Sequence, residues 1–215
     1  MAPSSSSAFL PLPPPVLVLA STSVYRHELL ARLRLPFDVV APDVDEFPLP
    51  GEVPAALSER LALAKARAVS ARRPHAVVIG SDQVAELDGM PMGKPGDHAH
   101  AVAQLRAMRG RTVVFHTAVA VLRHDTAFEA VRRVPVAVRF RALSDVEIET
   151  YLRLEQPYDC AGSAKCEALG IALLDAIESD DPTALIGLPL IVTSALLRQA
   201  GLDTLAIHAG HGSAA

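Results

Sequence analysis

The stretch Leu17–Leu30, Leu-Val-Leu-Ala-Ser-Thr-Ser-Val-Tyr-Arg-His-Glu-Leu-Leu, decides the fold. Its apolar start predicts a buried strand, and the leucines at its end begin a helical pattern. Between them, residues 21–23 carry hydroxyls that can cap the helix by accepting bonds from its free N–H groups. Such a helix start with Arg26 beside it favours phosphate binding. Taken alone, the stretch is better explained as an ordinary capped strand-to-helix turn.

Composition limits the protein class. A length of 215 residues, half of them apolar, predicts one domain or one domain with two lobes. The net charge of −4 argues against nonspecific binding to nucleic acid or to an anionic membrane, and no apolar run is long enough to span a bilayer. The two cysteines, Cys160 and Cys166, are too few for a zinc site or a disulfide framework, which fits a cytoplasmic protein.

The basic residues are unevenly chosen. Only three of the 20 are lysines: Lys65, Lys94 and Lys165. In a chain that otherwise uses arginine, a retained lysine indicates a position that needs a compact point charge, although chance also explains so small a number.

The ends of the chain are expected to be flexible. Residues 1–15 are rich in serine and proline and are excluded from the fold as a leader. Residues 16–205 are expected to form the domain, and residues 206–215 a flexible tail in which His208 and His211 could bind metal only nonspecifically.

Strand and helix signals alternate, which predicts an α/β fold. After the opening stretch we expect strands at 37–40, 76–79, 112–122, 131–140 and 171–174, and helices at 54–73, 97–108, 144–154 and 188–200. The strands 112–122 and 131–140 should form a hairpin around residues 124–126, and Ser144 and Glu147 match a capping box. Residues 89–95, 157–167 and 179–187 are expected to be loops.

Several loops carry charges that could do chemistry. Asp43, Asp45 and Glu46 repel each other, so either water solvates them or a cation binds them. Asp82 follows the apolar run 76–79, and acids at the carboxyl end of a buried strand often serve a site in α/β proteins. Lys94 stands in a loop rich in Gly and Pro.

With these residues in hand, the chain resembles the Maf family of nucleoside triphosphate pyrophosphatases. Six stretches match in order across residues 16–205: Leu19–Ser23 with Arg26, Val44–Glu46, Leu63–Ala66, Ile79–Gln83, Gly93–Pro95, and Cys160–Ser163 with Lys165 and Glu167. The resemblance implies an elongated mixed β-sheet flanked by helices, with two lobes and a central cleft. It also implies a homodimer, a divalent metal cofactor, Mg²⁺ or Mn²⁺, and hydrolysis of the bond between the α- and β-phosphates.

The matching residues look like the branch of the family that hydrolyses 7-methyl-GTP. The resemblance assigns Tyr25, Gln83 and Glu167 to the base, with Lys165 also in substrate binding. The chain departs from the family pattern at Val24, where proline is usual, at Tyr25, where tryptophan is expected, and at His27, where a second arginine is common. A methylated guanine is cationic, so a tyrosine face attracts it by roughly 0.5–2 kcal/mol and Glu167 can neutralise it. A buried carboxylate would reject thymine, which leaves it unpaired.

The resemblance also implies the catalytic roles. Arg26, Lys65, Lys94 and Ser21 are expected on the phosphates, Glu46 and Asp82 on the metal, and Asp82 as proton acceptor. As a catalytic set this gives Asp82, Glu46, Lys65 and Lys94. Two other functions stay open: a dTTP/UTP pyrophosphatase, and a nucleotide-binding regulator of cell division without catalysis.

Overall fold

The computed structural model describes residues 15–212, so the expected leader lies, except for Pro15, outside the described residues. One mixed sheet of seven strands forms the centre, in the order β2-β1-β3-β5-β6-β7 with β4 on β3. The strands are β1 (Leu17–Ala20), β2 (Phe37–Val39), β3 (Val77–Leu87), β4 (Met90–Met92), β5 (Thr112–Arg123), β6 (Phe128–Phe140) and β7 (Leu174–Glu178). The pairs β1–β2 and β1–β3 are parallel and the others antiparallel. The predicted α/β class with a mixed sheet is confirmed.

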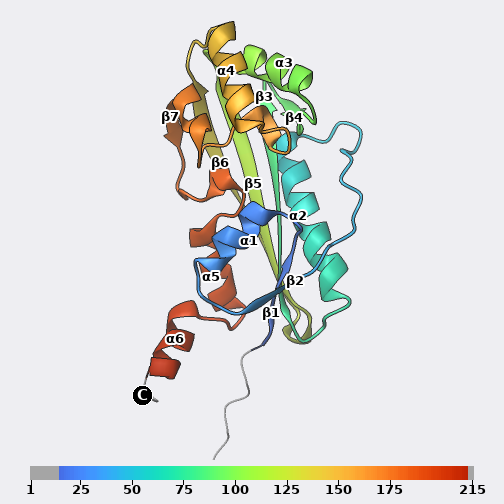
Figure 1. Ribbon diagram of the computed structural model, residues 1–215. Coiled ribbons are helices and arrows are strands. Elements are labelled where there is room, and N and C mark those ends of the chain that lie inside the picture. Colours follow the sequence, from blue (N-terminus) through green and yellow to red (C-terminus); the bar gives the residue numbers. More distant parts are fainter. Residues whose placement is uncertain (1–14, 213–215) are drawn as a thin grey trace, which may run out of the picture.

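Helices cover both faces of this sheet. They are α1 (Val24–Ala31), α2 (Pro54–Ser70), α3 (His98–Met108), α4 (Asp145–Glu155), α5 (Leu190–Gln199) and α6 (Thr204–Gly212). Figure 1 shows an elongated molecule, with β5 and β6 running along its length. None of the helices described between residues 15 and 212 is long and apolar enough to cross a membrane.

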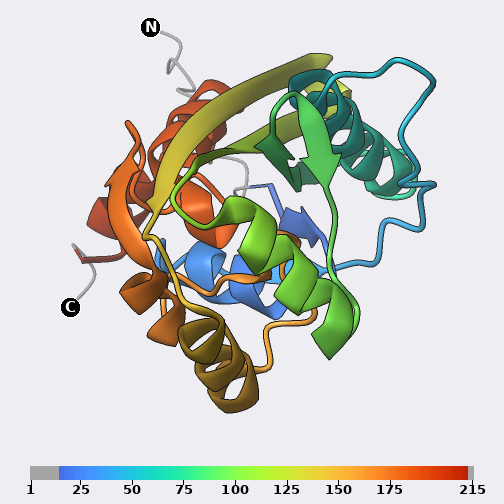
Figure 2. The same ribbon diagram turned by 90° about the horizontal axis from the view of Figure 1, so that it is seen from above.

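Three apolar cores hold the helices on the sheet. At one end, α1 and α5 pack on β1, β3 and β5 through residues such as Leu29, Leu197 and Ile79. On the opposite face, Ala62 and Ala66 of α2 contact the same strands. At the other end, α3 and α4 lie side by side over the far ends of β5 and β6 (Figure 2). The space between the two end cores is where the cavity described below lies.

Local signals in the sequence explain most element boundaries. Ser23 caps α1 by accepting from the backbone N–H of Arg26, and Asp97 caps α3 by accepting from that of His100. Ser144 and Glu147 form the predicted capping box of α4. The predicted hairpin is confirmed, with a single 3₁₀ turn at His124–Thr126 between β5 and β6.

Four predictions about elements were wrong. β3 does not end before Asp82 but runs on to Leu87, because β5 pairs with it along that length. Residues 90–92, expected in a loop, pair with β3 as β4. Residues 169–173 form a 3₁₀ helix, and the strand expected at 171–174 is β7, at Leu174–Glu178. Helix α6 continues through residues 206–212, which were expected to be a flexible tail.

Candidate active site

The site lies at a gap along one edge of β3. On that edge β1 pairs with Val77–Gly80 and β4 pairs with Ala85–Leu87, which leaves residues 81–84 without a strand partner on that side. Side chains of a strand alternate between its faces, so Asp82 points toward α2 and Gln83 toward the opposite face. The prediction that Asp82 closes a strand was wrong, but the structure gives it an equivalent position, since β1 ends beside it.

Helix α2 places Lys65 directly over Asp82. The Lys65 Nζ lies 2.6 Å from Asp82 Oδ1 and 2.7 Å from Glu46 Oε1. Lys65 and Asp82 are buried, whereas the Glu46 side chain is 57% exposed. Gly80 makes this approach possible, because a Cβ there would lie 2.6 Å from the Ala66 N and closer still to the Ala62 O. Lys65, expected on the phosphates, therefore joins the two acids and keeps one of its three N–H donors for a further partner.

The loop that carries Glu46 is fixed from α2. Arg60 forms a bidentate pair with Glu52, with an Nε–Oε1 distance of 2.6 Å, and its Nη2 donates to the Phe47 carbonyl oxygen at 3.0 Å. Among the three acids for which solvation and cation binding were both left open, Glu46 alone lines the cavity; Asp43 and Asp45 do not. The acidic loop thus contributes a single carboxylate.

The two carboxylates differ in their affinity for protons. Burial raises the pKa of Asp82 above its ordinary value, although Lys65 and Arg26 oppose the shift. Desolvation also acts on Glu46, but there the hydrogen bond and charge of Lys65, with Lys94 and Arg26, outweigh it and lower the pKa. Asp82 is consequently the better proton acceptor of the pair, and Glu46 stays ionised over a wider pH range.

Arg26 reaches the cavity from the first turn of α1. Its Nε donates to the Gly187 carbonyl oxygen at 2.9 Å. Among the described residues no hydrogen bond or ion pair engages its two Nη groups, so they are available to an anion. Ser21 is buried at the start of the same turn, and its Oγ accepts from the Ser23 N at 3.1 Å. His27 lies outside the cavity lining and packs against the Phe37 ring at 5.1 Å.

The segment 184–187 forms the opposite wall and is tied to the sheet through its carbonyl oxygens. Gln83 Nε2 donates to Ala184 O at 3.1 Å and to Leu185 O at 2.9 Å. Thr117 Oγ1 donates to Ala184 O, and Ser81 Oγ lies 2.8 Å from Ala118 O and 3.0 Å from Gly187 O, either of which can accept its single proton. Gln83, expected on the base, lines the cavity, but its amide N–H groups bind this wall.

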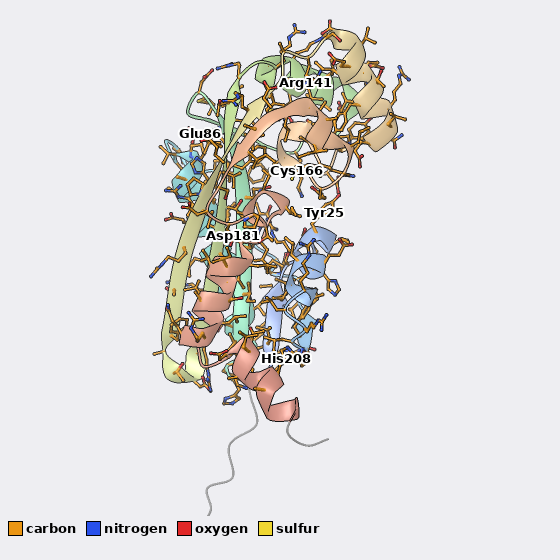
Figure 3. All side chains as sticks on the ribbon, turned by 90° about the vertical axis from the view of Figure 1, so that its left-hand side faces the viewer. Tyr25, Glu86, Arg141, Cys166, Asp181 and His208 are labelled. Atoms are coloured by element: carbon orange, nitrogen blue, oxygen red, sulfur yellow. The ribbon has the colours of Figure 1, made fainter. Side chains whose placement is uncertain are left out.

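The far end of the cavity carries an aromatic ring and acids. Tyr25 lies at the end of α1 that faces the loop carrying Cys166 (Figure 3). Cys160 Sγ is 3.8 Å from the Tyr25 Oη and 3.5 Å from Asp159 Oδ1. Glu167 also lines this end but is exposed, so the expectation of a buried carboxylate was wrong. Burial, with Cys160, Asp159 and Glu167, raises the pKa of Tyr25, which keeps the phenol neutral.

Lys94 and Lys165, the other two lysines, lie differently. Lys94 is exposed on the cavity rim, where its charge acts on Glu46. Lys165 is not part of the lining; its Nζ lies 3.8 Å from Glu155 Oε1 and its backbone N–H donates to the Tyr151 hydroxyl. The structure brings together every predicted site residue except Lys165. That residue instead connects the loop carrying Glu167 to Glu155 and Tyr151.

The cavity has a volume of about 810 Å³. It has a cationic half with Arg26, Lys65 and Lys94 and an aromatic, acidic half with Tyr25, Asp159 and Glu167. The described lining that sequence analysis did not anticipate includes Asp159, Cys160, Phe115 and residues 185–187. Asp159 adjoins the quoted Cys160–Ser163 stretch, which was the available signal; nothing local marked the 185–187 segment.

Comparison with known proteins agrees with this geometry. A family model described as "Maf-like protein" matches residues 16–200. The chain belongs to the Maf family. A Maf relative from Polaromonas sp. (strain JS666 / ATCC BAA-500), named 7-methyl-GTP pyrophosphatase, is 63% identical over 98% of this chain and 95% of its own length. Relatives with the same name occur in Albidiferax ferrireducens, 63% identical over 88% of this chain and 95% of the relative, and in Bordetella pertussis, 57% identical over 93% and 99%.

Proposed function

We propose that this protein hydrolyses the α–β phosphoanhydride of a nucleoside triphosphate, with 7-methyl-GTP as its substrate, and releases the monophosphate and pyrophosphate. This would remove a modified nucleotide from the cell's pool. The observation that carries the proposal is the convergence of three cationic side chains and two carboxylates, from distant parts of the chain, in one cavity. The names of the Maf relatives support the same activity.

The cationic half suits a triphosphate. Arg26 presents both Nη groups, which can form a bidentate contact with phosphate oxygens. The remaining N–H of Lys65 and the exposed charge of Lys94 can neutralise negative charge that develops as the anhydride breaks. Ser21 and the first N–H groups of α1 lie on the same side. Phosphoryl transfer depends mainly on such positioning and charge neutralisation.

Asp82 is the group that takes a proton from water. Its pKa is raised and so lies nearer to neutral pH than the pKa of an ordinary aspartate, which makes Asp82 a better base. The oxygen of that water bonds to phosphorus while the bridging P–O bond breaks. Lys65 holds Asp82 in place through the 2.6 Å contact and also limits the rise of its pKa.

The donor set fits a divalent cation, Mg²⁺ or Mn²⁺. Glu46 and Asp82 offer carboxylate oxygens, the ligands these ions prefer, and their second oxygens are not used by Lys65. In the described part of the chain no group of three or more such side chains gathers, so water and substrate phosphates would complete the coordination. When bound, the cation would neutralise phosphate charge.

The acidic half selects the base. The guanine of 7-methyl-GTP carries a positive charge, which the Tyr25 face attracts and the Glu167 carboxylate neutralises. Thymine and uracil carry no such charge. GTP has the same hydrogen-bonding edge but lacks the cation, so it should bind less well at this end.

A substrate panel tests the proposal. Pyrophosphate release is measured with 7-methyl-GTP, GTP, dTTP and UTP, each with Mg²⁺, with Mn²⁺ and with chelator. We expect 7-methyl-GTP to have the highest kcat/KM and the chelator to abolish turnover. Glu167→Ala should lower kcat/KM for 7-methyl-GTP and leave GTP nearly unchanged. A preference for dTTP and UTP would assign the other branch, and binding without turnover would support a regulator.

Two further expectations accompany the activity. The protein should be a homodimer, which light scattering after gel filtration measures. Both cysteines are free thiols, in keeping with the expected cytoplasmic location.

A further inference from the structure

The loop 179–190 is organised by one buried carboxylate. Asp181 is 1% exposed. Its Oδ1 accepts from the Thr183 N at 3.1 Å and the Thr183 Oγ1 at 2.8 Å, and its Oδ2 accepts from the N–H groups of Ile191 at 2.7 Å and Val192 at 3.3 Å. All four partners are donors, so the position requires an acceptor on both sides. Figure 3 places Asp181 near the start of α5.

These contacts join both ends of the loop. Ile191 and Val192 lie in the first turn of α5, where a negative charge is also favoured by the helix dipole. The Thr183 hydroxyl adds a second link, because it accepts from the Leu190 N at 2.8 Å and lies 2.9 Å from the Leu188 carbonyl oxygen. The segment between the two ends, residues 184–187, is therefore held at a fixed distance from α5.

That segment in turn contacts Arg26 in the cationic half of the cavity. The Gly187 carbonyl oxygen accepts a hydrogen bond from Arg26 Nε at 2.9 Å and lies 3.0 Å from Ser81 Oγ, and Ser81 precedes Asp82 in β3. No carboxylate pairs directly with the Arg26 guanidinium among the described residues, so this carbonyl is its one fixed contact. A shift of Gly187 would rotate the two Nη groups away from the phosphate that the proposed function assigns to them.

We propose that Asp181 is a positioning residue for the cationic half of the cavity. It fixes the loop 179–190, and the Gly187 carbonyl oxygen of that loop then fixes the Arg26 guanidinium. Asp181 is not in the cavity lining and touches no substrate. The inference rests on the proposed function, because it gives Arg26 its phosphate.

A double-mutant cycle tests this connection. Asp181→Asn keeps the size of the side chain but turns a donor toward donors. We expect about a tenfold fall in kcat/KM for 7-methyl-GTP, and almost no further fall when the same change is added to Arg26→Ala, since the lost contact is already absent. Asp203→Asn is the matched control, because Asp203 accepts from the Leu205 and Ala206 N–H groups at the start of α6 and touches neither the loop nor Arg26. Full additivity of Asp181→Asn with Arg26→Ala would overturn the proposal.

A second pair protects the test from a folding failure. Thr183→Ser keeps the hydroxyl and should retain activity, whereas Thr183→Val should reproduce the Asp181→Asn defect at a temperature where both variants are folded. Equal activity of the two would overturn the proposal.

Amide hydrogen exchange separates this inference from the enzymatic one. In Asp181→Asn, peptides covering 184–190 should exchange faster, and inorganic pyrophosphate should protect them less than in the wild type and in Asp203→Asn. If the wild type hydrolyses no nucleotide, the proposed function fails, and the exchange rates still decide the role of Asp181. Unchanged exchange in 184–190 would refute that role.

Discussion

The contact between Gly80 and α2 allows the sharpest prediction. In Gly80→Ala the new Cβ would lie 2.6 Å from the Ala66 N, whereas ordinary contact begins at 3.4 Å. The two nearest atoms on α2, the Ala62 O, which lies closer still, and the Ala66 N, are backbone atoms, so the helix must move away from β3 by about 1 Å. Overpacking of this kind costs about 1–3 kcal/mol, which lowers the Tm of a chain of this size by about 2–12 °C.

The same shift should reach the chemistry. Lys65 lies close to both Ala62 and Ala66 along α2. It therefore moves with the helix, and its 2.6 Å contact with Asp82 lengthens. A misplacement of this size can reduce kcat/KM about 100-fold. Since Lys65 lowers the pKa of Asp82, its withdrawal should raise that pKa further and move the acidic limb of the pH profile to higher pH.

Calorimetry and pH–rate profiles measure these effects. Gly93→Ala is the control for melting alone, because Gly93 has an ordinary φ and no atom within 4 Å of its Cβ position, although it lines the cavity. A Gly80→Ala protein with the wild-type Tm and turnover would show that α2 does not set the position of Lys65, and the reasoning would be refuted.

Three other outcomes are expected. The acidic limb of kcat/KM should fall at a pH above the ordinary range of an aspartate, because protonation at the raised pKa of Asp82 removes the base; a limb at or below the ordinary value, measured by a pH series, would contradict this. Tyr25→Phe should keep most of the selectivity for 7-methyl-GTP over GTP, measured as the ratio of the two kcat/KM values. Tyr25→Ala should lower that ratio roughly 2- to 30-fold, the equivalent of 0.5–2 kcal/mol. Equal losses in the two variants would exclude a contact with the ring face. Asp159→Asn should reduce the same selectivity about threefold, as expected for removing one charge near the cation in water, and more weakly at high salt; selectivity unaffected in low salt would exclude Asp159 from base recognition.

Local sequence patterns correctly predicted those elements whose contacts lie between residues close together in the chain. The caps at Ser23, Asp97 and Ser144 and the β5–β6 hairpin are features of this kind. The length of β3 was missed because its second half is stabilised by pairing with β5, which lies far along the chain, as in the pair Glu86 with Val114. Residues 171–174, most of which belong to the 3₁₀ helix Leu169–Leu173, were predicted as a strand because periodicity alone cannot distinguish a strand from a helix in so short an apolar run.

The candidate site shows the same division. Residue types and the family resemblance were enough to name every charged side chain of the cavity lining except Asp159, but not its apolar residues. They could not show that Lys65 joins both acids, nor that the Gln83 amide binds a wall of the cavity, since both contacts depend on tertiary distances. Asp181 drew no notice, because one aspartate in a loop has no distinguishing pattern until its four donors are seen.

The uninterrupted pairing of β3 with β5 limits how far the two ends of the molecule can move relative to each other. Ten consecutive residue pairs, from Val77 with Arg123 to Glu86 with Val114, pass beneath the cavity without a bulge. The two ends of the molecule can therefore rotate against each other only by small changes of strand twist shared among all these pairs. Entry and exit of a bulky nucleotide must then depend on the surface segments around the rim. The backbone amides that join β3 to β5 should stay slow to exchange with solvent throughout turnover, whereas those of residues 81–84 that face the open edge have no such protection.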